Sequence, residues 1–169
     1  SVQGAVNALT RDELEFVLGH ELGHIRCEHL LHLFLINVLP YVARMVPVVG
    51  PYLSMGLSAA LGEWYRKAEL SCDRMGLLVC QDPDAAVRMM MKSSGAPGAF
   101  YQRLDQAAFL RQYDEFRDLD RDMLSLIYKT LMTMDRSHPW TVERAGELVR
   151  WHAEGGYAAV FAGAVSAAP

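Results

Sequence analysis

The chain has 169 residues, the length of a single domain with a core of its own. Hydrophobic residues make up 51% of the chain and charged residues 21%, which excludes a chain that is disordered throughout. The net charge of −4 excludes the strongly basic surface of nucleic-acid-binding proteins, so we expect no nucleic-acid partner.

The three cysteines favour neither a disulfide framework nor a cysteine-rich zinc site. Cys27, Cys72 and Cys80 are odd in number, and the sequence contains no C-x-x-C pair. Unpaired cysteines are typical of reducing compartments, so we expect the cytoplasm or the cytoplasmic face of a membrane. Residues 1–9 contain neither an initiator methionine nor a targeting signal, which indicates a trimmed or processed N-terminus.

Residues 10–39 are predicted to form one long helix that ends before Pro40. Thr10 and Glu13 match a capping box, in which each residue binds the backbone N–H of the other at the start of a helix. On the wheel of this helix, His29 and His32 point away from the face that carries residues 20 and 24. We therefore predict surface positions for both, and no role as metal ligands.

The interior of this helix carries the motif HELGH at residues 20–24. His20 and His24 are four residues apart, so both imidazoles leave the same face of the helix. This arrangement suits two corners of a tetrahedral zinc site. Glu21 lies beside the pair as a candidate general base, so the motif predicts a catalytic zinc centre.

Residues 30–62 form an apolar stretch in which Arg44 is the only formal charge. Prolines and glycines between residues 40 and 51 divide the stretch into two limbs, which predicts a helical hairpin. Neither limb reaches the roughly 18 uninterrupted apolar residues of a membrane-spanning helix. Two interpretations stay open: the hairpin is buried against the core or another chain, or it dips into a membrane.

The second limb continues as a helix that is predicted to carry a third zinc ligand, Glu69. The limbs between His24 and Glu69 are about 24 and about 27 Å long, so folding the hairpin brings the two residues level. Asp73, one turn beyond Glu69, is placed to accept the second ring N–H of a ligating histidine. In the alternative, both carboxylates are solvated or pair with Arg66 and Arg74.

Further helices are predicted after residue 80, without an internal repeat. Asp82 is the expected N-cap of a helix that begins at Pro83 and is closed by Gly95. Apolar periodicity predicts other helices over residues 100–116, 123–134 and 141–152. Because no segment has a clear strand pattern, we predict a mainly α fold with little or no sheet, in one domain over residues 1–169.

Three motifs together resemble the gluzincin family of HtpX-type heat-shock proteases and CAAX prenyl proteases. They are HELGH at residues 20–24, Glu69-x-x-x-Asp73, and His138-Pro139 followed by Glu143-Arg144. The resemblance covers roughly residues 9–152 and includes the hydrophobic insertion between the first two motifs. It implies a zincin-type helical metalloprotease core in which His20, His24 and Glu69 bind one Zn²⁺ and Glu21 activates water.

The same resemblance implies that His138 and Arg144 hold the substrate or the tetrahedral intermediate. The expected activity is zinc-dependent endopeptidase cleavage of polypeptides, in protein quality control or processing. Prenyl proteases have several membrane helices that this chain lacks, so a prenylated substrate is not expected. Family members also have strands ahead of the first motif, so we expect the N-terminal part of the domain to be missing.

The alternative function is a zinc-stabilised helical module without catalysis, in which the metal is structural and residues 30–62 bind a partner or a membrane. A homo-oligomer is a further candidate assembly. The presence of Glu21 argues against it, because a structural zinc site needs no general base.

Overall fold

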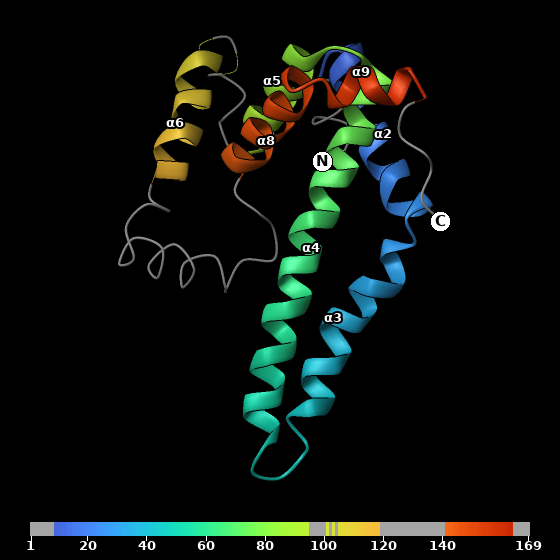
Figure 1. Ribbon diagram of the computed structural model, residues 1–169, viewed down its shortest axis with the longest axis vertical. Helices are drawn as coiled ribbons and strands as arrows, with labels where there is room; N and C mark the ends of the chain where they lie inside the picture. Colours follow the sequence, from blue (N-terminus) through green and yellow to red (C-terminus); the bar gives the residue numbers. More distant parts are fainter. Residues whose placement is uncertain (1–8, 95–100, 102, 104, 119–140, 164–169) are drawn as a thin grey trace.

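The computed structural model describes residues 9–94, 101, 103, 105–118 and 141–163 (Figure 1). These residues contain helices and no strand, which confirms the predicted mainly α fold. The helices are α2 (Arg11–Arg26), α3 (His29–Ala43), α4 (Gly50–Cys80), α5 (Pro83–Ser93), α6 (Gln106–Asp118), α8 (Thr141–Ala153) and α9 (Gly156–Phe161). The predicted helix over 123–134, Gly95 and His138 lie outside the described residues.

The predicted capping box is present at the start of α2. Thr10 Oγ1 accepts a hydrogen bond from the backbone N–H of Glu13 at 3.3 Å, and Glu13 Oε2 accepts one from the backbone N–H of Thr10 at 2.7 Å. The prediction of one helix from residue 10 to 39 is wrong, however. Glu28 has a left-handed backbone (φ 53°) that ends α2 and redirects the chain into α3, so that both helices pack along the long helix α4.

The predicted helix end before Pro40 is also wrong, because α3 continues through this proline to Ala43. A proline inside a helix removes one backbone hydrogen bond. Pro40 is buried, so packing of its ring offsets part of that loss.

The predicted hairpin is confirmed, and it extends away from the rest of the molecule (Figure 1). We call residues 30–62 the arm: most of α3, the turn over residues 44–49, and the first part of α4. Large apolar side chains on it are exposed, including Val48 at 87% and Tyr52 at 76%. Among the described helices, none has the length and hydropathy needed to cross a membrane.

The core lies at the other end of α4, where α2, α5 and α8 pack against it. Its buried residues are Phe16, Leu77, Cys80, Ala86, Met90, Ala145 and Leu148. The two motif helices approach closely at Gly76, where a Cβ atom would lie 2.8 Å from the ring and from the carbonyl oxygen of Phe16. Because glycine has no side chain, α2 and α4 can come together at this position.

Helix α5 begins as predicted and is tied to α2. Asp82 Oδ1 accepts hydrogen bonds from the backbone N–H groups of Asp84 and Ala85, and Pro83 is the first helical residue. Lys92 Nζ, near the end of α5, lies 2.6 Å from Oε2 of the buried Glu13. This ion pair fixes the start of α2, the helix that carries HELGH, to the core.

Candidate metal centre

Three side chains from α2 and α4 bring their donor atoms together. The Nε2 atoms of His20 and His24 are 3.1 Å apart. Glu69 Oε1 lies 3.3 Å from His24 Nε2, and Glu69 Oε2 lies 3.7 Å from His20 Nε2. Two nitrogens that bind one Zn²⁺ at about 2.1 Å in tetrahedral geometry are about 3.4 Å apart. This donor set therefore fits a zinc ion, and the predicted return of Glu69 to the level of His24 is observed.

Asp73 contacts the other ring nitrogen of His20. Its side chain is fully buried, and Oδ1 lies 3.0 Å from His20 Nδ1. Arg144 donates two hydrogen bonds to this carboxylate, from Nε at 2.8 Å and from Nη2 at 2.6 Å. Burial by itself would raise the pKa of Asp73, but the hydrogen bonds from Arg144 and His20 outweigh it and hold this pKa below its ordinary value. Asp73 is therefore a carboxylate that can orient His20.

The alternative partners considered for the two carboxylates are engaged elsewhere. Arg66 donates to Glu63, and the guanidinium of Arg74 lies 5.3 Å from the ring centre of Trp151. Solvation is excluded as well, because Glu69 and Asp73 are 2% and 0% exposed.

Arg144, on α8, joins the two acidic residues of α4. Besides its bonds to Asp73, its Nη1 lies 3.0 Å from Glu69 Oε2. The guanidinium is thus bound within the centre, and contact with a substrate stays a prediction for this residue. Arg144 is separated from Asp73 by 71 residues, so no local pattern places it here, and only the family resemblance indicated a role for it.

Sequence reasoning placed His29 on the surface, and that prediction is wrong. His29 is 5% exposed, and its Nδ1 lies 3.1 Å from Nδ1 of His24 and 3.5 Å from Cys72 Sγ. The wheel used for the prediction assumed a continuous helix, whereas the turn at Glu28 changes the direction in which the His29 side chain points. His24, His29 and Cys72 form a second group whose donor atoms lie within 4.8 Å of one another.

Burial lowers the pKa of His24, and the nearby charge of Glu69 offsets this only in part. His24 is therefore held in the neutral form that a metal ion requires.

Tyr65 is a second residue that sequence reasoning did not assign to the site. It lies one turn before Glu69 on α4, and the i, i+4 spacing is the signal that could have found it. Burial raises the pKa of Tyr65 far above its ordinary value, and its charge interaction and hydrogen bond with Glu69 raise it further. Tyr65 is therefore a neutral phenol that donates to Glu69.

Glu21 occupies the exposed face of α2 next to the centre, between its two histidines in the sequence. An exposed carboxylate at this position is accessible to water and to a bound peptide, as a general base requires.

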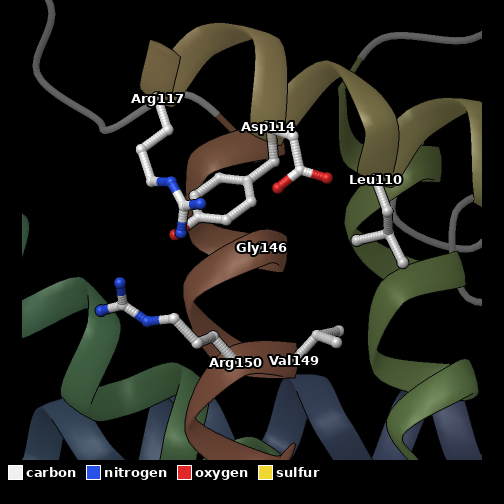
Figure 2. Close-up of a pocket in the computed structure, with 7 residues that line it drawn as sticks. Leu110, Asp114, Arg117, Gly146, Val149 and Arg150 are labelled. Atoms are coloured by element: carbon white, nitrogen blue, oxygen red, sulfur yellow. The ribbon is translucent and has the colours of Figure 1, made fainter. Parts of the chain in front are cut away.

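A cavity of about 210 Å³ lies between α6 and α8, apart from the centre (Figure 2). It is lined by Leu110, Tyr113, Asp114, Arg117, Gly146, Val149 and Arg150. None of these residues belongs to the candidate centre. Tyr113 donates a hydrogen bond of 2.6 Å to Glu147, and its ring packs on Gly146, where any Cβ would overlap it. We interpret this cavity as part of the α6–α8 packing.

Comparison with known proteins identifies relatives of the chain. The model of peptidase family M48 matches residues 2–152. An Arabidopsis thaliana protein named "Plastoglobule-localized metallopeptidase 48, chloroplastic" is 38% identical over 146 residues, which are 86% of this chain and 42% of that protein. The chain thus spans less than half the length of this relative, and no solved structure matches it significantly. The family match confirms the resemblance inferred from the three motifs.

Proposed function

Because the chain belongs to peptidase family M48, we propose that it is an endopeptidase with one catalytic zinc ion, held by His20, His24 and Glu69. The observation that carries this proposal is the convergence of two imidazole nitrogens and one carboxylate within 4.8 Å of one another. Three protein ligands that leave a fourth position open are typical of catalytic rather than structural zinc. When bound, Zn²⁺ would polarise the scissile carbonyl and lower the pKa of water to about 7.

The protein itself supplies the proton transfers. The Glu21 carboxylate takes a proton from the attacking water and delivers it to the nitrogen of the leaving amine. Asp73 accepts the Nδ1–H of His20 and so keeps Nε2 of that ring directed toward Glu69. Arg144 holds Asp73 and Glu69 in place through three short contacts. His138 and Arg144 are the proposed hydrogen-bond donors to the substrate carbonyl oxygen. The proposed substrates are polypeptides that are degraded in protein quality control or cleaved during processing.

The substitution Glu21→Gln tests this mechanism. Gln keeps the size of the side chain and the helix but cannot accept the proton, so peptide hydrolysis falls about 10²–10⁴-fold. Zinc content and thermal stability stay at wild-type values, because Glu21 is neither a proposed ligand nor part of the core. The matched control is Glu15→Gln, on the same helix and outside the centre. Equal hydrolysis of unfolded protein by the zinc-loaded wild type and Glu21→Gln would contradict the mechanism.

We further propose that the arm rests in a lipid surface. Its tip exposes apolar side chains from both limbs, including Tyr41, Met45 and Tyr52, and a contiguous surface of this kind is rarely left in water. The one formal charge of the arm, Arg44, is at an exposed position, and its Nε donates a hydrogen bond to the buried Ser54 hydroxyl. The limbs are short for spanning a bilayer but suit shallow insertion.

Backbone geometry at the tip gives the proposal a second support. Val48 has a left-handed backbone (φ 66°), which is unfavourable for a β-branched residue, and its side chain is 87% exposed. Glycine would fit this backbone better, yet the position carries an apolar side chain. This strained and exposed apolar residue supports a hypothesis of contact at the tip.

A further inference from the structure

Each of the two candidate histidine ligands has a partner on the ring nitrogen that faces away from Glu69. For His20 the partner is Asp73, whose Oδ1 lies 3.0 Å from Nδ1. For His24 the partner is His29, and the two Nδ1 atoms are 3.1 Å apart. Both rings therefore direct Nε2 toward Glu69 and Nδ1 toward a second side chain.

The position of His29 is fixed by its surroundings. It is the first residue of α3, directly after the left-handed turn at Glu28, and its side chain is 5% exposed. The ring meets the indole of Trp64 edge-on, with centroids 5.3 Å apart and an interplanar angle of 88°. Cys72 Sγ lies 3.5 Å from its Nδ1. An imidazole enclosed in this way presents its Nδ1 to His24 in a defined direction.

The protons in this contact follow from the chemistry of imidazole. A neutral ring has one N–H and one bare nitrogen, and a metal binds the bare one. If Nε2 of His24 is a ligand, its proton is on Nδ1, and this N–H points at Nδ1 of His29. Nδ1 of His29 must then be bare, so the proton of His29 is on its Nε2.

We propose that His29 is a positioning residue for His24: its bare Nδ1 accepts the Nδ1–H of His24 and fixes the tautomer and ring plane that present Nε2 to zinc. The inference rests on the proposed zinc site. His29 accepts the Nδ1–H of His24 as Asp73 accepts the Nδ1–H of His20, but the two acceptors differ in charge. A neutral acceptor adds no charge to the centre, whereas Asp73 adds one negative charge.

A second metal ion between His24, His29 and Cys72 is the competing interpretation, because their donor atoms also lie within 4.8 Å of one another. That ion would require His24 to give up its last proton and bind metal through both nitrogens. It would also require the fully buried Cys72, whose Sγ lies 3.5 Å from His29 Nδ1, to lose its thiol proton on binding the ion. The hydrogen bond between His24 and His29 requires neither change.

Two substitutions at position 29 distinguish a role as hydrogen-bond acceptor for His24 from a role in filling the interior. His29→Asn places an amide oxygen near the position of Nδ1 and retains an acceptor, whereas His29→Leu fills the space without one. His152→Leu, at an exposed position of α8, is the matched control. Zinc affinity is measured by competition with a chelator, and the geometry of the centre by the absorption spectrum of the Co²⁺-loaded protein.

We expect zinc affinity to fall about 10–100-fold in His29→Leu, with an altered Co²⁺ spectrum. His29→Asn should stay near the wild type, and His152→Leu should not differ from it. The proposal is overturned if His29→Leu binds zinc like the wild type, or if His29→Asn is as weak as His29→Leu. It is also overturned if the wild type binds two metal ions per chain and Cys72→Ala binds only one.

If His29→Leu does not fold, ¹⁵N NMR of the histidine rings in the zinc-loaded wild type decides the question. The expected result is a proton on Nδ1 of His24 and on Nε2 of His29. A proton on Nδ1 of His29 would refute the hydrogen bond. A wild type that binds no zinc would instead overturn the proposed function, and this inference with it. If the wild type binds zinc and His29→Leu binds it equally well, only the inference about His29 is overturned.

Discussion

Asp73 Oδ1 lies 3.0 Å from Nδ1 of His20, and this contact between residues 53 positions apart joins α4 to the histidine face of α2. The carboxylate is fully buried and receives two hydrogen bonds from Arg144 on α8. One side chain thus connects three helices at the candidate centre. A buried carboxylate with these partners is retained as an anion, so it can orient the imidazole and balance the charge of Arg144.

Asp73→Asn should weaken zinc binding without removing it. The amide keeps one acceptor for His20 but no longer carries the charge that pairs with Arg144, so zinc affinity falls about 10–100-fold. The free energy of unfolding should fall by up to about 3–5 kcal/mol, because Arg144 is left without its main partner. Chelator competition and urea denaturation measure the two effects. Asp84→Asn, at an exposed position of α5, is the control, and wild-type zinc affinity in Asp73→Asn would contradict the assignment.

The proposed ligand set predicts which single substitutions abolish metal binding. His20→Ala, His24→Ala and Glu69→Ala each remove one of three donors and should leave less than one zinc ion per chain after dialysis. His152→Ala, at an exposed position, should keep full occupancy. Metal content measured by atomic emission tests this prediction. Full occupancy in Glu69→Ala would show that α4 does not supply the third ligand.

Gly76 should be essential for the approach of α2 and α4. A Cβ at this position would lie 2.8 Å from the ring and the carbonyl oxygen of Phe16, so Gly76→Ala should cost about 1–3 kcal/mol of unfolding free energy. Gly56→Ala, in the same helix, is the matched control because nothing lies within 4 Å of its Cβ. It should stabilise the protein by about 0.5–1 kcal/mol. Urea denaturation measures the free energy of unfolding of both variants. If Gly76→Ala and Gly56→Ala change it equally, the close contact at Gly76 is refuted.

The arm should bind neutral lipid through its tip. Val48→Gly relieves a left-handed backbone and removes an exposed apolar side chain, so it should keep or slightly raise stability while weakening flotation with phosphatidylcholine vesicles. Gln81→Gly relieves the same conformation at the end of α4 and should not affect flotation. A wild-type chain that stays in the aqueous fraction and has the mass of a dimer would instead show that a second copy covers the arm.

Tyr113 should contribute stability that is lost at alkaline pH. Burial raises the pKa of Tyr113 to about 12, and the hydrogen bond to Glu147 contributes. The neutral phenol is favoured in the folded state, so its contribution is complete below the unfolded pKa of about 10 and is lost as the pH rises to about 12. Tyr113→Phe should therefore be less stable than the wild type at pH 8, and this difference should shrink between about pH 10 and 12. Urea denaturation across this range measures the difference, and a constant difference would contradict the prediction.

The periodicity and the rise of the α-helix were enough to predict that His20 and His24 share a face and that Glu69 returns to their level. Residues four apart share a face of any α-helix, so the sequence alone places His20 and His24 on one face. The lengths of the two limbs between His24 and Glu69 brought these residues level, because rise per residue is a local property. The same holds for the capping box of Thr10 and Glu13, and for the start of α5 at Asp82.

The tertiary structure alone decided the positions of His29 and Arg144. No glycine or proline near Glu28 predicts the break between α2 and α3. The break exists because α2 and α3 both pack along α4. His29 is buried beside Cys72, 43 residues away, and Arg144 lies on Asp73, 71 residues away. Patterns along the chain report which residues share a helix face. They do not report which faces meet, because that depends on packing between segments distant in the sequence.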